Sequence, residues 1–456
     1  MGHSVGIIGA GPAALIIAER LCAFADVTIL DVGESLETRT SITEGFGGAG
    51  AFSDGKFNLE PKIGSRLTTI MSEHELSDKI NEVDRFFINY GAPDDADYIK
   101  ESLFPRSFLR QCREAGFQLI AGATRHWGTD VGRTIVSNLY DVLKDKVTIH
   151  QNVRVDPLIH REGGVEVVAT LESGSHSYFN FDELIIAVGR SGSTWMKEFY
   201  NKTAMPHFPG ATDIGVRYEC PSEVFEECFQ WTYEPKLSMI SSRGEKVRLF
   251  CSCLDNGRVA IEKYVHNDVV CVNGHSYSAD SGMPPTGNSN FAILVTTRFT
   301  APYDDPDSYC RSICKIANTL AGSDSGVIVQ AYRDFLKGRR SYDNRIQEAG
   351  VRPSCLEAIP GDVSCIIPYR QMVGIVEFID AAEKVFPGVS SGLMYCPEVK
   401  FYSSEADIDP VNLHFKGESK IYPVGDCSGW TRSLAGAAVH GYLVADKILE
   451  KLSIKG

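Results

Sequence analysis

The pattern of apolar residues changes partway through the first thirty positions of the chain. Residues 5–8 form a short, continuous apolar run, which is typical of a buried strand, and the chain then turns at glycines. The apolar stretch that follows continues as a helix to residue 21, and residues 27–31 form a second strand-like segment. We therefore expect a strand, a turn, a helix and a strand in succession, which is the beginning of an α/β domain.

Several later segments carry equally clear patterns. Apolar residues at helical spacing begin at Leu76, and a second amphipathic helix is expected over residues 133–143. Residues 147–171 resemble paired strands that turn at the glycine pair 163–164, and residues 183–189 form another buried strand that ends in glycine. Strands and helices are therefore expected to alternate in this part of the chain.

The middle of the chain, residues 196–395, has a different pattern. It is rich in strand-like segments, with Asn-Gly turn signals at residues 256–257 and 273–274. Helical pieces follow near residues 309–320 and 374–385. This composition predicts a mixed α+β domain.

The final stretch returns to a strand, a Ser/Gly turn and a helix. The simplest architecture is an α/β fold with one Rossmann-like nucleotide-binding domain split between residues 1–195 and 396–456. A helical insertion in this domain is expected at about residues 66–130. The mixed α+β domain of residues 196–395 is inserted before the last strand and helix, and we expect it to bind the substrate.

Charge and cysteine content narrow the class of protein. The chain has 456 residues and a formal net charge of -14, which argues against nucleic acid as a partner because nucleic-acid-binding faces are usually basic. Residues 5–24 are largely apolar, but Glu19 and Arg20 interrupt them and no Lys or Arg precedes them, so we expect neither a signal peptide nor a membrane anchor. The thirteen cysteines include no CxxC pair and no zinc-ligand spacing. We expect reduced thiols, no metal, no membrane partner and a cytoplasmic location.

A glycine fingerprint, Gly9-x-Gly11-x-x-Ala14, lies between the first strand and the first helix. In such a fingerprint the first glycine makes a tight turn, the second lets the backbone meet a pyrophosphate, and the small third residue permits close packing. The helix N-terminus supplies unpaired N–H groups for the phosphates. Asp31, at the end of the next strand, can accept hydrogen bonds from both hydroxyls of an adenosine ribose. This order of elements predicts a bound dinucleotide.

Two later segments resemble the other FAD motifs of the two-dinucleotide-binding flavoproteins. The sequence LIIAVGRSG places Ala187 and Gly189 after an apolar strand, and IYPVGD ends in Gly425 and Asp426. The resemblance implies that Asp426 binds the ribityl chain and that the helix after it points its N-terminus at the flavin, where it would stabilise the negative charge of the reduced ring. FAD is therefore the expected cofactor. The residues expected to bind it from these motifs, with the Val153 backbone added at the adenine by analogy with the fold, are Gly9, Gly11, Pro12, Ala13, Ala14, Asp31, Val153, Ala187, Gly189, Gly425, Asp426 and Ala437.

The run GFGGAGAFSDGKFNL, residues 45–59, holds four glycines within six residues. Glycine is costly to order, so this backbone must be closely approached by another group. Together with RHWGTD, FCSCLDNG, VNGHSYS, DFLKGRRS and the YPVGD segment, the run resembles a family of bacterial FAD-dependent dehydrogenases of mostly unknown substrate, over nearly the whole chain. The resemblance implies that the flavin and pyrophosphate are lined by Gly47, Gly48, Ala49, Gly50, Ser53, Asp54 and Lys56.

The turn after the last strand departs from that family. Relatives carry a glycine-rich turn there, whereas this chain has CSGWTR over residues 427–432. Bulky Trp430 and Arg432 near the flavin suggest an altered substrate pocket, and Arg432 is a candidate catalytic residue.

Two further pairs have both a chemical and a structural interpretation. His275 and Tyr277 alternate along a predicted strand after the Asn-Gly turn at residues 273–274, so both would face one side and could act as acid and base over a flavin. A hydrogen-bonded histidine without catalytic duty is the alternative. Cys251 and Cys253 could form a redox dithiol, although alternate positions on one strand rarely bridge comfortably. Structural thiols are the alternative for this pair.

Arg339 and Arg340, in the sequence KGRRS, form a third ambiguous pair. Adjacent guanidinium groups could clamp a substrate carboxylate. The alternative is a solvated helix end.

The reaction expected from these features is hydride transfer between a small organic substrate and FAD, by a dehydrogenase or an oxidase. The middle of the chain has no second GxGxxG unit for a separate NAD(P)H domain. An NAD(P)H-dependent flavin monooxygenase, with NAD(P)H as a transient reductant, is one alternative. A non-redox flavoprotein such as an isomerase or cyclase is another, and the acidic charge disfavours a tRNA-modifying flavoprotein. The electron acceptor is unknown.

Overall fold

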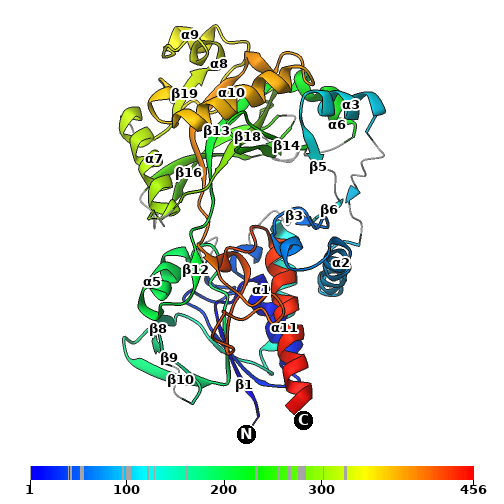
Figure 1. Ribbon diagram of the computed structural model, residues 1–456, viewed down its shortest axis with the longest axis vertical. Coiled ribbons are helices and arrows are strands. Elements are labelled where there is room, and N and C mark those ends of the chain that lie inside the picture. The colour runs from blue at the N-terminus through cyan, green and yellow to red at the C-terminus, as the bar shows by residue number, and fades with distance from the viewer. Residues whose placement is uncertain are drawn as a thin grey trace. The chain divides into compact units, whose positions relative to one another are not determined.

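The computed structural model of the protein describes residues 2–39, 41, 44–51, 56–94, 97–98, 104–120, 123–127, 129–160, 163–231, 235–254, 256–264, 269–275, 284–300, 302–303, 305–322 and 326–455. The chain divides into two compact units, each with its own apolar core (Figure 1). Unit 1 comprises Met1–Tyr98, Gly122–Gly210 and Tyr402–Gly456, and unit 2 comprises Ile99–Ala121 and Ala211–Phe401.

A five-stranded parallel sheet forms the centre of unit 1. Its order is β23, β11, β1, β2, β7. From β1 the chain first builds outward in one direction through β2 and β7, and it then returns to add β11 and β23 on the other side of β1. This is the Rossmann arrangement, in which the strand order reverses beside β1. All four residues of β11 are buried, as expected for a parallel strand covered on both faces. The strands are β1 (Ser4–Ile8), β2 (Asp26–Leu30), β7 (Thr148–His150), β11 (Glu183–Ile186) and β23 (Ile421–Pro423).

Helices α1 and α11 pack side by side in unit 1, although they lie at opposite ends of the chain (Figure 1). Their approach is close because a Cβ added at Gly441 would lie 2.6 Å from the Ala13 carbonyl oxygen. The helices of this unit are α1 (Pro12–Leu21), α2 (Glu73–Asn89), α4 (Thr129–Leu143), α5 (Ser193–Thr203) and α11 (Leu434–Lys455), with short 3-10 turns η1 (Gly48–Ala51), η2 (Leu67–Thr69) and η9 (Gly425–Ser428).

Three small sheets complete unit 1. The first contains β8 (Arg154–His160), β9 (Val165–Thr170) and β10 (His176–Phe181), the second β3 (Lys56–Asn58), β4 (Asp97–Tyr98) and β6 (Ala123–His126), and the third β12 (His207–Phe208) and β22 (Glu405–Ala406).

Unit 2 is built on an eight-stranded mixed sheet in the order β20, β19, β21, β13, β18, β15, β14, β5. The strands are β5 (Gln118–Ile120), β13 (Thr212–Pro221), β14 (Lys236–Ile240), β15 (Lys246–Cys253), β18 (Asn288–Thr297), β19 (Ile328–Ala331), β20 (Ile359–Pro360) and β21 (Leu393–Lys400). A separate pair is formed by β16 (Arg258–Tyr264) and β17 (Val269–His275). The helices are α3 (Arg106–Glu114), α6 (Glu226–Phe229), α7 (Pro306–Ala321), α8 (Tyr332–Phe335), α9 (Asp343–Gln347) and α10 (Tyr369–Glu383), with 3-10 turns η4 (Ser222–Phe225), η7 (Val363–Cys365) and η8 (Val389–Ser391).

The predicted α/β class, a Rossmann-like domain with an inserted α+β domain, is confirmed. The unit boundaries differ from the predicted positions after residues 195 and 395, because α5 packs on β8 of unit 1 and β21 continues in the sheet of unit 2 to Lys400. Part of the expected helical insertion, Ile99–Ala121, also belongs to unit 2. There β5 pairs with β14 at the edge of the large sheet, a long-range pairing that local patterns do not reveal.

The expected hairpin turn at Asn273 and Gly274 is wrong. Both residues lie within β17, where they pair with Ala260 and Val259 of β16. Glycine is required at 274 for a different reason, since a Cβ there would clash with the guanidinium of Arg217. The Asn-Gly pair therefore marks a close approach between β17 and a buried arginine.

Candidate functional site

The motifs predicted to bind a dinucleotide lie at the carboxyl ends of three neighbouring strands of unit 1. Gly9 follows β1, Ala187 follows β11 and Gly425 follows β23. Backbone hydrogen bonds tie the three ends together, with Ala187 donating to Ile8 and Val424 donating to Ile186, both at 2.8 Å. Parallel sheets bind ligands at this edge, beside the point where the strand order reverses. The structure thus brings together segments more than 400 residues apart in the sequence.

Gly9 and Gly11 are glycines for different reasons. Gly9 has φ +101°, and a Cβ there would clash with the Ala187 carbonyl, so the protein itself requires this glycine. Gly11 has φ -76° and ψ 179°, a conformation open to any residue, and a Cβ there would meet no described atom within 4 Å. Nothing in the described protein excludes a side chain at Gly11.

The N-terminus of α1 is open at the same place. Pro12 is the first helical residue, and no side chain caps the helix N-terminus at Gly11. Ala14 is fully buried and Ala13 nearly so, which lets α1 pack closely on its neighbours. On the far side of the edge, Gly189 has φ +64° and also has open space where a Cβ would lie. The positive end of the α1 dipole and the unoccupied volume coincide, which suits a phosphate.

Asp31 follows β2 and is 6% exposed. Its two carboxylate oxygens accept hydrogen bonds from the Ala10 and Gly33 N–H groups, both at 2.8 Å. Burial raises the pKa of this carboxyl above its usual value, and the two backbone donors oppose that shift. Asp31 is therefore held in one orientation by the fingerprint turn itself. The Val153 N–H donates to the Asp31 carbonyl and is therefore already used within the protein. A contact between adenine and the other backbone atoms of Val153 stays a prediction.

The glycine-rich run packs on the fingerprint turn. Gly47 donates to the Ala10 carbonyl at 2.8 Å, a Cβ at Gly48 would lie 2.9 Å from Gly11 Cα, and a Cβ at Gly50 would lie 2.6 Å from Pro12 Cγ. The Gly11 backbone thus excludes a side chain at Gly48 and the Pro12 ring excludes one at Gly50, whereas the nearest obstacle at Gly47 is the Val136 side chain. Ala49 is exposed and Lys56 is the half-buried first residue of β3. Ser53 and Asp54 lie outside the described residues, and contact of this run with a flavin stays a prediction.

Arg39, a residue that no sequence motif indicated, holds the glycine-rich run in place. Its side chain is 6% exposed, and its Nη1 donates to the carbonyls of Gly45, Phe46 and Gly48 at 3.1, 2.7 and 3.1 Å. Burial lowers the pKa of this guanidinium, and the charge of Asp31 opposes the shift. Arg39 lies in an irregular stretch, where no periodicity or motif could have singled it out.

Asp426 lies in the turn after β23 and is held by two donors. Thr431 Oγ1 donates to one carboxylate oxygen at 2.8 Å, and Arg190 Nη2 donates to the other at 3.1 Å. The Arg190 side chain is half exposed. Ala437 of α11 is half buried, and its Cβ lies 3.6 Å from the position of a Cβ at Gly425.

His440, which no sequence motif indicated either, holds the same turn from α11 through a hydrogen bond. It is fully buried on α11, and its Nδ1 accepts a hydrogen bond from the Gly425 N–H at 3.3 Å. Its Nε2 has no hydrogen-bond partner among the described residues. Burial lowers the pKa of His440 to about 4, so the imidazole is neutral at neutral pH.

Arg432, a predicted catalytic residue, lies between the Asp426 turn and α11 in unit 1. Its guanidinium stacks over the Tyr402 ring at 3.8 Å from the centroid, and its backbone N–H donates to Gly64 at 2.8 Å. Trp430 is nearly buried, and its indole N–H donates to the Ala406 carbonyl at 2.9 Å. The two bulky residues of this turn therefore have different surroundings, one anchored in the protein and the other stacked on an aromatic ring.

His275 is an exposed residue at the end of β17 in unit 2. Tyr277 lies outside the described residues, so the predicted acid–base pair stays a prediction.

The pair Cys251 and Cys253 does not follow simple strand alternation. The pairing of β15 with β18 slips between Phe250 and Cys253, and Cys251 has φ +52°. The Cys251 carbonyl accepts a hydrogen bond from Arg217 Nη2 at 2.6 Å, and Cys253 Sγ lies 3.5 Å from the same nitrogen. All thirteen cysteines are among the described residues and none forms a disulfide.

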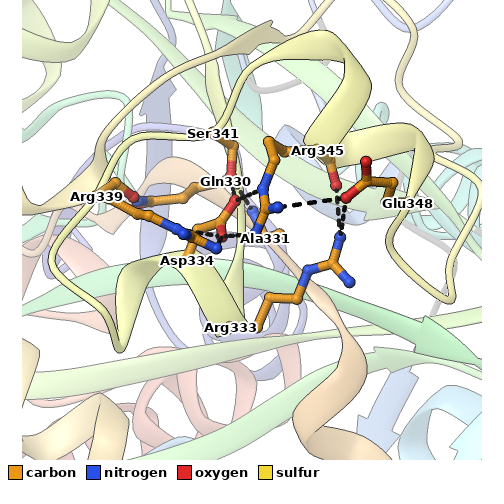
Figure 2. Close-up of polar contacts among 8 residues, drawn as sticks. All are labelled: Gln330, Ala331, Arg333, Asp334, Arg339, Ser341, Arg345 and Glu348. Atoms are coloured by element: carbon orange, nitrogen blue, oxygen red, sulfur yellow. Dashed lines mark hydrogen bonds and ion pairs between the residues drawn. The ribbon is translucent and has the colours of Figure 1, made fainter.

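Arg339 binds a carboxylate, but one of the protein's own (Figure 2). Asp334 is fully buried in unit 2, and Arg339, Arg345 and Ser341 donate to it at 2.8–2.9 Å. These partners hold the pKa of Asp334 well below its usual range, with the hydrogen bond from Arg345 as the largest cause. The neighbouring Arg340 is exposed and stacks over Tyr342. Arg339 is therefore committed to this internal cluster.

Two searches of the described residues gave negative results. No described helix combines the length and the apolar character needed to cross a membrane. Among the same residues, no group of three or more His, Cys, Asp and Glu side chains is placed to hold a metal ion.

Comparisons with known proteins give distant similarities. No protein-family model matches the chain. A curated protein of Clostridium beijerinckii (strain ATCC 51743 / NCIMB 8052), described as uncharacterized, is 24% identical over 497 residues, which cover 98% of this chain and 81% of that protein.

Among solved structures, the chain is similar to three enzymes of known name. A glycine oxidase from Geobacillus kaustophilus aligns with TM-score 0.39 and 11% identity over 98% of this chain and 95% of that one. A glycerol-3-phosphate dehydrogenase from Bacillus halodurans, complexed with FAD, gives 0.38 and 11% over 100% and 65%. An E. coli quinol fumarate reductase chain gives 0.44 and 13% over 100% and 71%. At these scores and identities, shared function does not follow from the similarity.

Proposed function

We propose that the protein is an FAD-dependent oxidoreductase, a dehydrogenase or oxidase that transfers a hydride between a small organic substrate and flavin. The main support for this proposal is that three motifs distant in sequence meet at one edge of a parallel sheet. At that edge Gly11 is a glycine that neither its backbone conformation nor its described neighbours require. A ligand that approaches the backbone there explains the residue, and the open N-terminus of α1 favours a ligand that carries phosphate.

The residues at this edge fit the parts of FAD in turn. Gly11 and the first turn of α1 would bind the pyrophosphate, and the oriented carboxylate of Asp31 would accept hydrogen bonds from the adenosine ribose. Asp426, oriented by Thr431, would bind the ribityl hydroxyls. When bound, FAD supplies the two-electron chemistry. The protein's part is binding, orientation and the local electrostatic field.

The second helix N-terminus at this edge belongs to α11. Ser433 Oγ accepts a hydrogen bond from the Gly436 N–H at 3.0 Å, so one donor of the first turn is already satisfied. The positive end of the α11 dipole would stabilise negative charge on a reduced flavin ring. His440 keeps Gly425 in place for the same purpose, through its bond to the Gly425 N–H.

As part of this proposal, unit 2 sets which substrate is accepted, and His275 and Tyr277 are the candidate acid and base. We also propose a cytoplasmic location and no nucleic-acid or membrane partner, supported by the acidic charge and the unpaired thiols. NAD(P)H as a transient reductant belongs to the alternative of a flavin monooxygenase.

Anaerobic titration of the purified protein tests the proposal. We expect stoichiometric FAD, bleaching of the flavin spectrum by a metabolite pool, and recovery of the spectrum when an oxidant is admitted. Bleaching by NAD(P)H, accelerated by an aromatic compound, would indicate a monooxygenase instead. Turnover of a compound without any change in the flavin spectrum would indicate a non-redox flavoprotein. Protein that binds no FAD when reconstituted would contradict the proposal altogether.

A further inference from the structure

The position of Arg432 in unit 1 is fixed from both sides. On one side Thr431 donates to Asp426, and on the other Ser433 Oγ donates to the Gly64 carbonyl at 3.2 Å and accepts from Gly436. The backbone N–H of Arg432 donates to the same Gly64 carbonyl. The residue therefore sits directly between the carboxylate proposed to bind the ribityl chain and the first turn of α11.

The guanidinium of Arg432 has no carboxylate partner among the described residues. Its central carbon lies over the Tyr402 ring, 3.8 Å from the centroid, and its Nε is inaccessible to solvent and has no hydrogen-bond partner among the described residues. Two other arginines of unit 1 are paired with carboxylates, Arg125 with Asp84 through two bonds of 2.7 Å and Arg66 with Glu405.

An uncompensated, partly buried guanidinium is costly, and this chain has 59 acidic against 45 basic residues from which a partner could have been drawn. A partner that arrives with a ligand removes the anomaly. The guanidinium held over Tyr402 carries paired N–H donors, which suit a planar, two-oxygen acceptor. The pyrophosphate of FAD belongs at the α1 N-terminus, so it is not the expected partner of Arg432.

We propose that Arg432 binds the carboxylate of the substrate, and hence that the substrate is a small organic carboxylate. This inference rests on the proposed function, because it places the carboxylate beside bound flavin. Arg432 acts as a substrate-binding residue, and Tyr402 acts as a positioning residue that holds the guanidinium plane. A lysine at 432 would keep the charge but lose the fork and the stacking.

Titration of the FAD-loaded protein with acetate and benzoate tests this inference, with acetamide, benzamide and inorganic phosphate as matched probes. The readout is the change in the visible absorption of flavin, which gives a dissociation constant for each probe. We expect the carboxylates to perturb the spectrum and the amides not to. The Arg432→Met variant should weaken carboxylate binding by about 10- to 100-fold, and Arg432→Lys should lie between the two.

The control variant is Arg340→Met. Arg340 also stacks on a tyrosine, at 4.7 Å from the Tyr342 ring, but it is exposed and belongs to unit 2. This variant should bind carboxylates as the unmodified protein does. Each variant is first checked for its FAD content and thermal unfolding, so that a loss of fold is recognised and Arg432→Lys can replace a variant that fails to fold.

Several results would overturn the inference. They are equal binding of amides and carboxylates, tighter binding of phosphate, unchanged carboxylate affinity in Arg432→Met, or no response to any carboxylate in the unmodified protein. A shift of the flavin reduction potential in Arg432→Met with unchanged carboxylate affinity would also overturn it, because the arginine would then serve the flavin ring. A chain that binds no FAD would defeat the proposed function and this inference together, whereas FAD-loaded protein that ignores carboxylates would defeat the inference alone.

Discussion

The Asp334 cluster of unit 2 and the strand-end edge of unit 1 handle polar groups in opposite ways. In the cluster, two arginines and a serine surround one buried carboxylate, and the charges are matched within the protein (Figure 2). At the edge, the α1 N-terminus has no side-chain cap, Gly11 faces open space, and the Arg432 guanidinium has no carboxylate partner among the described residues. The cluster is thus satisfied within the protein, whereas the edge has the open groups on which the proposed ligand site rests.

Gly48→Val disrupts the packing of the glycine-rich run on the fingerprint turn and should have the largest effect on stability. Gly48 has φ +53°, which a β-branched residue rarely adopts, and its Cβ would press on the Gly11 backbone. We expect unit 1 to lose about 4 kcal/mol of unfolding free energy from strain and overpacking, together with its flavin. Chemical denaturation of the apo protein measures the first effect. Stability equal to that of the unmodified chain would contradict the packing described for the glycine-rich run.

His440 is a titratable group at the edge of unit 1, and burial is the cause of its lowered pKa. It therefore contrasts with Asp334, whose pKa is lowered by its bonding partners. Its folded pKa of about 4 lies below the unfolded value, so the stability it contributes is present above pH 6.5 and is lost as the pH falls toward 4. The expected loss is about 3 kcal/mol. His440→Asn keeps an acceptor for the Gly425 N–H but does not titrate. Denaturation at pH 7 and pH 4.5 should show a smaller pH dependence in the variant, and identical dependence would count against the buried neutral imidazole.

Asp334→Asn opens the closed cluster. The variant leaves Arg339 and Arg345 without their carboxylate, but both are partly exposed, so we expect a destabilisation of only about 2 kcal/mol. Because the pKa of Asp334 is depressed, its contribution is present above the unfolded value near pH 4 and disappears as the pH falls below it. Unmodified protein and variant should therefore converge in stability in acid. FAD content should not change, and a loss of flavin would show that the cluster is not purely structural.

Gly11→Val places a side chain in the open space at the edge of unit 1 and should have the smallest effect on stability. No described atom lies within 4 Å of the new Cβ, so the apo protein should unfold within about 0.5 kcal/mol of the unmodified chain. FAD affinity should nevertheless fall by about 100-fold or more, since the side chain occupies the place proposed for the pyrophosphate. Fluorescence titration with FAD gives the affinity. Unchanged affinity with unchanged stability would remove the pyrophosphate from Gly11.

Local sequence patterns predicted the fold of unit 1 well, because its motifs lie in short, contiguous segments. Gly9, Gly11 and Asp31 stand at fixed distances from an apolar strand, and the Rossmann order follows from alternating strands and helices. The residues that were missed belong to no motif and no periodic pattern of their own. Arg39 binds carbonyls from an irregular stretch, and His440 supports Gly425 from inside a helix that reads only as apolar. Gly274 was misread as a turn because the arginine that crowds it is distant in sequence.

The assembly of unit 1 from both ends of the chain has a consequence for its biosynthesis. The edge strand β23 and helix α11 supply Ile421, Ala438 and Val444 to the core of unit 1, and all three are fully buried. The ribosome makes these residues after it has made all of unit 2, and domains generally fold in the order in which they emerge. We therefore expect unit 2 to complete its fold first. The edge with Gly11 and Asp426 forms only after all of unit 2 has been synthesised, so the proposed flavin would bind after unit 2 has folded.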